Sequence, residues 1–323
     1  MRHLFIINPI SFLKEAKLNF FIKRIKKYFD SSGASYHMHI SRFPRDEIYA
    51  IRSYMQNITG KETVRVYAVG GDGTAFSCLN GLVGLPNTEL ALLPYGASND
   101  NVRNFGEGLF EEFRNIEYQV KSSTIPVDII KCGTNYALNF CIVGIEAVAA
   151  KMVIDVYRDV KIKYPIVQKL LPIFFTWSCI LSSFDRSIMN QQYTIIADEK
   201  DISGQYANIY IANGACRGGN KTPIIAAVPN DGILDMLLVQ PHIPLKVVQT
   251  IIPYMKGRYD KYPDMYSLYQ VKHVFIKSNN PLWINIDGES FFDSEIDIKI
   301  IPNAVKLVAV NNRIFPLRKT YNE

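Results

Sequence analysis

The most constraining feature of this sequence is a glycine cluster that directly follows a strand-forming run. Residues 64–69 are rich in valine, and Gly70-Gly71-Asp72-Gly73 follows them, just before a helical stretch at 74–82. Open parallel sheets bind ligands where a strand ends and a helix begins, because glycines let backbone N–H groups approach phosphate and the helix N-terminus adds its dipole. The cluster therefore predicts an α/β fold with a nucleotide site. An ordinary Asp-Gly turn that caps the helix is the alternative.

The residues around this cluster alternate between strand and helix patterns. Apolar residues recur at helical spacing between 18 and 29 and again between 45 and 57. Strand patterns precede, separate and follow these stretches, at 3–8, 36–40, 64–69 and 89–94. Such alternation predicts a doubly wound parallel sheet over residues 1–124.

Beyond residue 125, short β-type runs separated by turn residues replace this pattern. They predict a mainly antiparallel β-sandwich domain over residues 125–306, with helical interruptions at about 147–184 and 245–256. A chain of 323 residues is longer than one compact core usually organises, which agrees with two domains. Residues 307–316 predict one more strand, and the segment 307–323 is expected to pack back on the first domain.

Cysteine usage and hydropathy limit the cellular location. The five cysteines are scattered, odd in number and without a C-x-x-C pair, so neither a disulfide framework nor a zinc site of that kind is expected. The first residues lack the pattern of a secretory leader. The longest apolar stretch, 170–181, contains Pro172 and is shorter than the roughly 20 residues that cross a bilayer. We expect a cytoplasmic protein that is at most peripheral to a membrane.

Six further short motifs accompany the glycine cluster and follow one another along the chain. They are Asn8-Pro9 with Ser11, Gly96-Ala97-Ser98-Asn99-Asp100-Asn101, Gly144 with Ala147, Asn213-Gly214 with Gly218-Gly219, Val228-Pro229-Asn230-Asp231-Gly232-Ile233, and Asp287-Gly288-Glu289. Together with Gly70-Gly71-Asp72-Gly73-Thr74, this series resembles the bacterial lipid kinases of the diacylglycerol kinase catalytic-domain family. An NAD kinase, which shares the glycine motif, should also carry an internal Asn-Glu pair, and here that pair occurs only at 322–323.

The resemblance implies an ATP-dependent phosphotransferase that uses Mg²⁺ and binds ATP in a cleft between its two domains. It would transfer the γ-phosphoryl group of ATP to the hydroxyl of a diacylglycerol-like lipid at the membrane surface. The family's threonine in the second glycine motif is Ala97 here, so one hydroxyl expected near the nucleotide is missing. The positions that the resemblance assigns to nucleotide binding are Asn8, Ser41, Gly70, Gly71, Asp72, Gly73, Thr74, Ala75, Phe76, Gly96, Ala97 and Asn99.

The resemblance also assigns catalytic and metal-binding roles. Glu289 would be the base that takes the proton of the acceptor hydroxyl, with Asp287 beside it, and Asp72 would hold the Mg²⁺ on the ATP phosphates. A second Mg²⁺ would bind the Asp231 side chain and the backbone carbonyls of Val228 and Ile233. Taken without the resemblance, the same residues fit an Asp-Gly hairpin with a solvated glutamate and a plain Asn-Asp-Gly turn.

The positive charge of the chain is concentrated at one end. Residues 1–60 contain ten Lys and Arg against four Asp and Glu, which accounts for the whole net charge of +6. Within them, Phe20, Lys23, Arg24 and Lys27 share one helix face, opposite the apolar face. This face suits contact with the anionic inner surface of a membrane that holds the lipid substrate, and a merely solvated helix is the alternative.

Other partners are less well supported by the sequence. No recognised nucleic-acid module accompanies the basic helix, so no nucleic-acid partner is expected. The aromatic segment 174–177 fits either a buried core or lipid contact. The sequence leaves open whether the chain forms a homodimer.

Two other functions compete with a lipid kinase. A kinase of a small soluble alcohol or of NAD would share the phosphate chemistry without any dependence on vesicles. A catalytically silent protein that binds lipid or nucleotide is the second, and Ala97 is the residue that suggests it.

Overall fold

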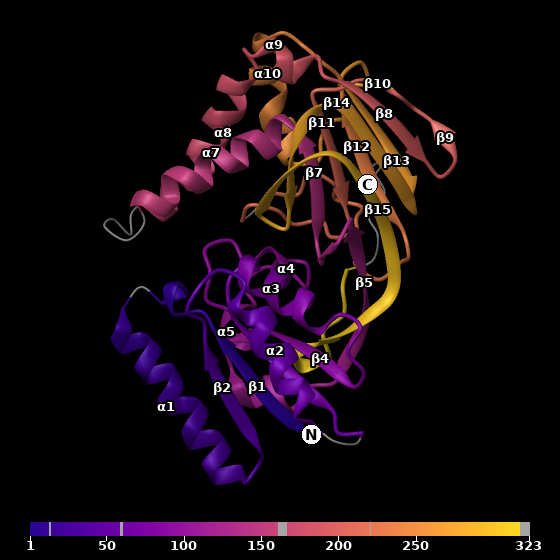
Figure 1. Ribbon diagram of the computed structural model, residues 1–323. Helices are drawn as coiled ribbons and strands as arrows, with labels where there is room; N and C mark the ends of the chain where they lie inside the picture. The colour runs from indigo at the N-terminus through magenta and orange to yellow at the C-terminus, as the bar shows by residue number, and fades with distance from the viewer. Residues whose placement is uncertain (13, 59–60, 161–166, 220, 317–323) are drawn as a thin grey trace. The chain divides into compact units, whose positions relative to one another are not determined.

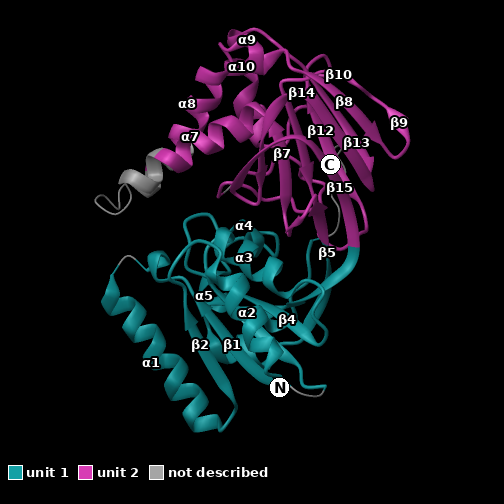
Figure 2. Cartoon of the chain, in the orientation of Figure 1, with its two compact units in different colours: residues 1–128, 302–316 teal, residues 129–301, 317–323 magenta. Residues whose placement is uncertain are grey.

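A computed structural model describes residues 1–12, 14–58, 61–160, 167–219 and 221–316. The described chain forms two compact units, residues 1–128 with 302–316 and residues 129–301 (Figure 2). The sequence-based division lies at 124 and 306, whereas the structure divides the chain at 128 and 301 and includes residues 302–316 in the first unit. The part of the expected C-terminal segment beyond residue 316 lies outside the described residues.

The first unit is built on a parallel sheet in the order β15-β4-β3-β1-β2 (Figure 1). The strands β1, β2, β3 and β4 come from the N-terminal half of the chain, and the end of β15 joins them by pairing Leu307 with Leu90. Their bounds are Arg2–Ile7 (β1), Tyr36–Ile40 (β2), Val64–Gly70 (β3), Thr88–Pro94 (β4) and Glu289–Val308 (β15). The helices of this unit are Glu15–Ser32 (α1), Asp46–Gln56 (α2), Asp72–Leu82 (α3), Asp100–Arg103 (α4), Phe110–Phe113 (α5) and Ile116–Lys121 (α6).

The core of the first unit forms around β3, which is buried along its whole length. Aromatic rings fill the space beside it, and Phe5 stacks on Tyr67 with ring centroids 4.2 Å apart. Helix α3 packs so closely on α2 that a Cβ on Gly81 would lie 2.9 Å from the Ile51 side chain. These contacts fix the direction of α3, and therefore the place of its N-terminus at the end of β3.

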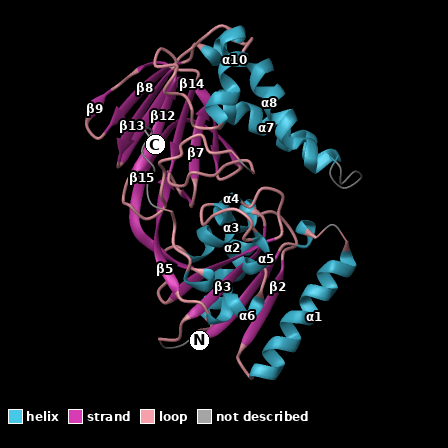
Figure 3. Cartoon of the chain, turned by 180° about the vertical axis from the view of Figure 1, so that it is seen from behind, coloured by secondary structure: helices cyan, strands magenta, loops and turns pink. Residues whose placement is uncertain are grey.

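The second unit is an antiparallel β structure with a group of helices on one side (Figure 3). Its main sheet runs in the order β13-β12-β11-β7-β14-β15, and β8 pairs with β14. The strands are Thr124–Cys132 (β5), Asn135–Ala137 (β6), Phe140–Gly144 (β7), Gln192–Ala197 (β8), Lys200–Asp201 (β9), Gly204–Gln205 (β10), Asn208–Ala212 (β11), Leu234–Val239 (β12), Tyr266–Val271 (β13) and His273–Ile286 (β14). The helices are Ile145–Val160 (α7), Val167–Ser182 (α8), Arg186–Met189 (α9) and Pro244–Met255 (α10).

The predicted fold class, a parallel α/β domain followed by a β-sandwich-like domain, is confirmed, but two expected strands are wrong. One of the β-type runs beyond residue 125, 136–143, predicts a single strand but forms β6 and β7 instead, because the backbone turns at Leu138–Asn139 and directs its N–H groups to a buried carboxylate. Residues 307–316 do not form a strand either. Strand β15 ends at Val308, and Asn311 and Asn312 adopt φ values of 53° and 57°, which no strand accommodates.

The helices of the second unit lie in the regions that the sequence predicts, but their bounds differ. The interruption expected at 147–184 consists of α7 and α8, and the one at 245–256 is α10. Among the described residues no helix is long and apolar enough to cross a membrane.

Candidate active site

The glycine cluster forms the junction between β3 and α3. Strand β3 ends at Gly70, as the sequence predicts, and α3 begins at Asp72, two residues before the predicted start at 74. A Cβ on Gly70 would lie 2.2 Å from Oγ1 of Thr74, so no larger residue fits there. A Cβ on Gly96 would lie 2.3 Å from Cα of Gly71, so the loop after β4 packs backbone to backbone on the loop after β3. The two glycine motifs are therefore one structural element at the carboxyl ends of neighbouring strands.

Asn8 attaches the end of β1 to this element. Its side-chain Oδ1 accepts a hydrogen bond from N of Ile10 at 3.1 Å, and its Nδ2 donates to Oγ1 of Thr74 at 3.1 Å. Asn8 and Thr74 therefore lie together, although 66 residues separate them.

Asp72 lies at the first position of α3 and faces the second glycine loop, residues Gly96–Asn101, which follows β4. Its Oδ1 accepts hydrogen bonds from N and from Nδ2 of Asn101, at 3.2 and 3.1 Å. Burial raises the pKa of the Asp72 carboxyl, and the N–H groups of the facing loop oppose that rise. Asn101 was not among the predicted site residues, although it stands in the Gly96–Asn101 motif that could have identified it.

The side chain of Asn99, a residue of the second glycine loop, holds that loop in shape. Asn99 has a φ of 52°, its Oδ1 accepts from N of Gly96 at 3.0 Å and its Nδ2 donates to O of Gly96 at 2.8 Å. Its amide therefore shapes the loop. Ala97 is exposed at the loop's tip.

Some of the residues predicted to bind the nucleotide line a cavity, whereas Phe76 and Ser41 do not. Gly70, Gly71, Asp72, Ala75 and Asn99 line a cavity of about 200 Å³ together with Asn101. The ring of Phe76 is buried, with the guanidinium of Arg45 at 5.6 Å from its centroid, so Phe76 packs within the core. Ser41 follows β2, and its buried Oγ has no hydrogen-bond partner among the described residues.

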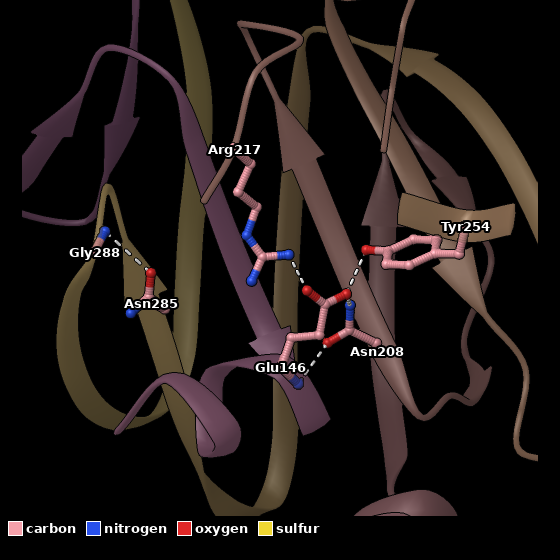
Figure 4. Close-up of polar contacts among 6 residues, drawn as sticks. All are labelled: Glu146, Asn208, Arg217, Tyr254, Asn285 and Gly288. Atoms are coloured by element: carbon pink, nitrogen blue, oxygen red, sulfur yellow. Dashed lines mark hydrogen bonds and ion pairs between the residues drawn. The ribbon is translucent and has the colours of Figure 1, made fainter. Parts of the chain in front are cut away.

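In the second unit, Asp287 and Gly288 form the turn between β14 and β15. Asp287 has a φ of 47° and Gly288 a φ of 94°, and N of Gly288 donates to Oδ1 of Asn285 at 3.1 Å (Figure 4). The Asp287 carboxylate is 2% exposed and accepts from the backbone N–H groups of Leu138, Asn139 and Phe140 at 2.6, 3.1 and 2.8 Å. Asp287 therefore anchors the hairpin to the β6–β7 turn, while Glu289, the next residue but one, is partly exposed.

A third segment fastens the same turn. O of Asn139 accepts from N of Asn213 at 2.8 Å, and Nδ2 of Asn139 donates to O of Cys216 at 2.6 Å. Nδ2 of Asn213 donates to O of Leu138 at 2.7 Å. The Asn213-Gly214 motif and the Asp-Gly-Glu motif thus meet at the β6–β7 turn, a turn that none of the sequence motifs contains.

The expected second magnesium site lies in a loop of the second unit. Asp231 is exposed, and its Oδ1 accepts from N of Ile233 at 3.1 Å, while O of Val228 accepts from N of Asn230 at 2.9 Å. One carboxylate and two carbonyls are oxygen donors of the type that Mg²⁺ takes. Within the described ranges, no three His, Cys, Asp or Glu side chains gather as a metal cluster.

The basic helix face has the amphipathic arrangement that the sequence indicates. Lys23, Arg24 and Lys27 are exposed on α1, and Phe20 among them is 63% exposed. On the opposite face Phe21, Ile25 and Phe29 are buried in the first unit.

Comparison with known proteins agrees with this arrangement. Residues 2–132 match the diacylglycerol kinase catalytic domain, and residues 175–309 match the YegS C-terminal NAD kinase beta sandwich-like domain. Two Staphylococcus aureus proteins named "Putative lipid kinase", from strains MRSA252 and N315, are each 26% identical over 272 residues, which are 81% of this chain and 84% of theirs.

Solved structures share the fold. A crystal structure titled as a putative diacylglycerol kinase from Bacillus anthracis is similar with a TM-score of 0.72 at 20% identity, covering 97% of this chain and 98% of that one. A second structure, titled as a diacylglycerol kinase of the same organism, has a TM-score of 0.69 at 18% identity, with the same coverage. Through the domain matches over residues 2–132 and 175–309, the chain belongs to the diacylglycerol kinase catalytic domain family.

Proposed function

We propose that this protein transfers the γ-phosphoryl group of ATP to the hydroxyl of a diacylglycerol-like lipid at a membrane surface. The observation that carries the proposal is the contact of Gly71 with Gly96, which aligns two glycine loops beside the N-terminus of α3 and the Asp72 carboxylate. A loop pair of this kind, at the carboxyl edge of a parallel sheet, suits the phosphates of a nucleotide.

The first unit supplies the residues for ATP. The first turn of α3 has backbone N–H groups without partners inside the helix, and its dipole favours negative charge. Asp72 would hold Mg²⁺ through one of its oxygens or through a water, with the N–H groups of Asn101 bonded to Oδ1. The bound cation would neutralise phosphate charge during transfer, and it would also keep the Asp72 carboxyl ionised despite its burial.

The second unit supplies the base. The carboxylate of Glu289 would take the proton from the lipid hydroxyl as that oxygen bonds to the γ-phosphorus and the bond to the β-phosphate oxygen breaks. Asp287 has a different part in this proposal. Because its oxygens are occupied by three backbone N–H groups, it positions the hairpin that carries Glu289.

The test measures label from γ-labelled ATP in lipid extracts after incubation with Mg²⁺ and mixed lipid vesicles. Label should appear with the native chain and be lost in Glu289→Gln and Asp72→Ala. A matched control is Glu295→Gln, which removes an exposed glutamate of the same strand, paired with Lys277 at 3.0 Å. Label in a soluble alcohol or in NAD would favour the first rival, and ATP binding without any labelled product would favour a silent binder.

We further propose that α1 assists contact with anionic lipid at the inner face of the membrane. The exposed cations Lys23, Arg24 and Lys27 support this, and each well-placed cation contributes about 1 kcal/mol near such a surface. Changing all three to Gln should weaken flotation with anionic vesicles, and unchanged flotation would exclude the helix as a contact.

A further inference from the structure

The side-chain amide of Asn285, at the end of β14, is bonded through its oxygen but not through its nitrogen. Oδ1 accepts from N of Gly288 at 3.1 Å (Figure 4), whereas Nδ2 is buried and makes no hydrogen bond to any described residue. The residue as a whole is 2% exposed. Leaving a buried N–H group without an acceptor is costly, and native proteins contain few such groups. The amide therefore indicates an acceptor that the described chain does not supply.

The bond to Gly288 fixes the orientation of this amide. A backbone N–H can only donate, so the Asn285 atom that faces it must be the oxygen, and the NH2 group must lie on the other side. An aspartate at this position would hold the same N–H with a carboxylate and would bring no donor. Asn285 thus carries a donor that the turn between β14 and β15 does not use.

A second buried polar group lies opposite this donor. Ser290 is paired directly with Asn285 in the register of β14 and β15, so the two side chains share one face of the hairpin. Its Oγ is also buried and has no hydrogen-bond partner within the described ranges. The Cβ atoms of such a pair are about 5 Å apart, so one atom between the two side chains can bond to both. A carbonyl oxygen suits this place, because its two lone pairs accept from two donors at once.

The pair stands next to the proposed base. Glu289 and Ser290 are the first two residues of β15, and their Cα atoms are therefore about 3.8 Å apart. Successive side chains of a strand point to opposite faces, so the two residues border the end of the hairpin from its two sides. A ligand whose hydroxyl meets Glu289 can thus bring a group a few bonds away to Ser290 and Asn285.

The carboxylates of the hairpin favour a neutral ligand. Asp287, which is 2% exposed, lies two residues from Asn285, and Glu289 adds a second carboxylate. A phosphate or carboxylate bound between Asn285 and Ser290 would be repelled by both charges at short range. An uncharged carbonyl group would not.

Cations that neighbouring elements bring to this part of the sheet are paired with carboxylates. The guanidinium of Arg217 lies 5.4 Å from the ring centroid of Phe140, and it forms an ion pair with Glu146 (Figure 4). Lys151 of α7 lies 5.2 Å from the ring centroid of Trp283. Its ammonium group is paired with Asp155. Neither cation therefore adds an uncompensated positive charge that would draw an anion to Asn285.

We propose that Asn285 is a specificity-determining residue, whose amide N–H binds an ester carbonyl oxygen of the acceptor together with the Ser290 hydroxyl. This inference rests on the function proposed above, in which the acceptor is a diacylglycerol-like lipid with an ester a few bonds from its reacting hydroxyl. The carbonyl oxygen completes the hydrogen bonding of both buried groups. An ether lipid has no carbonyl, leaves both groups unpaired in the complex, and is bound more weakly.

Binding without ATP tests the site apart from catalysis. The ligands are dioctanoylglycerol, which has two esters, and dioctylglycerol, which has ethers in their place. The native chain should bind the diester at least about tenfold more tightly in isothermal titration. Asn285→Asp keeps an oxygen for N of Gly288 but removes the donor, and it should abolish this preference. The charge that it adds acts on both ligands alike, so the ratio of the two affinities isolates the donor.

Two further variants separate recognition from a structural role. Ser290→Ala removes the second group without touching the turn, and it should reduce the preference for the diester. Asn279→Asp is the matched control, because it makes the same change at an exposed position of β14, and it should keep the native ratio. An effect on the fold of the hairpin alone would weaken both ligands equally and leave the ratio unchanged.

Three results would overturn the proposal: equal binding of the two ligands by the native chain, binding of neither, or an unchanged ratio in Asn285→Asp and Ser290→Ala. The last would mean that water satisfies the two buried groups. Failure of the proposed kinase function looks different. A native chain that prefers the diester but transfers no label to it retains the site and loses the function, whereas equal labelling of diester and diether retains the function and overturns the site.

Discussion

The carboxylate of Asp287 accepts a hydrogen bond from the backbone N–H of Leu138 at 2.6 Å, across 149 residues of sequence. With the neighbouring N–H groups of Asn139 and Phe140 it fixes the Asp-Gly-Glu hairpin on the β6–β7 turn. Asp287, which the sequence motifs place beside the proposed base Glu289, is thus a structural anchor, and its loss should lower the stability of the fold as well as the turnover.

Asp287→Asn should lower the free energy of unfolding of the second unit by about 3 kcal/mol, because an amide presents N–H groups to N–H groups in a buried place. Glu289→Gln should change stability by less than about 0.5 kcal/mol, since Glu289 is partly exposed. Denaturant unfolding followed by circular dichroism measures both. Equal stability of the two variants would contradict the anchoring role.

Gly96→Ala should weaken ATP binding by at least about tenfold, because the new Cβ would lie 2.3 Å from Cα of Gly71 and must force the two loops apart. The exposed neighbour Ala97 gives the control, and Ala97→Ser should bind ATP as well as the native chain or better. Isothermal titration with an ATP analogue compares the three proteins. Native affinity in Gly96→Ala would mean that the glycine contact does not shape the nucleotide site.

Arg217→Met should destabilise the second unit by about 3–5 kcal/mol, because it leaves the Glu146 carboxylate buried without its cation. Adding Glu146→Gln should recover much of that loss, since the uncompensated charge is then gone. A double-mutant cycle on thermal unfolding measures the coupling. Additive losses would show that the two side chains act independently.

Stability should fall as the pH decreases from about 6.5 to 4. Burial and the nearby Arg65 lower the pKa of His3 to about 4, so the folded protein keeps this ring neutral, whereas the unfolded chain binds a proton at about its ordinary value of 6.5. The neutral His3 ring therefore contributes up to about 3 kcal/mol to the free energy of unfolding above pH 6.5. This contribution is lost as the pH falls towards 4.

His3→Gln should flatten that pH dependence, at the cost of the contact between Nδ1 of His3 and the Tyr67 hydroxyl at 2.7 Å. His37→Gln, on the exposed side of β2, should retain the native dependence. Unfolding midpoints between pH 4 and pH 8 make the comparison, and an unchanged slope in His3→Gln would refute the assignment.

Local patterns predicted the strands and helices around the glycine cluster well, because they alternate along the sequence and the cluster marks the junction between β3 and α3. The same patterns could not predict the break at Leu138–Asn139, since its cause is a carboxylate 149 residues away. Asn101 was missed for a similar reason. Its contact with Asp72 arises only when two loops pack through Gly71 and Gly96, and no local preference of Asn101 reveals that contact.

The aromatic segment on α8 shows another limit of the sequence. Hydrophobicity alone left burial and exposure undecided, and the same helix shows both: Phe175 packs against Cys179 and Ile251, whereas Trp177 is 59% exposed. Which residue takes which side depends on the packing of α8 against α10, which the sequence does not specify.

The most direct test of the central claim is transfer of label from γ-labelled ATP to diacylglycerol in anionic vesicles with Mg²⁺. Our account predicts labelled phospholipid with the native chain and with Glu295→Gln, and at least about a hundredfold less with Glu289→Gln. Undiminished transfer by Glu289→Gln, or ATP binding by the native chain without any labelled lipid, would contradict it.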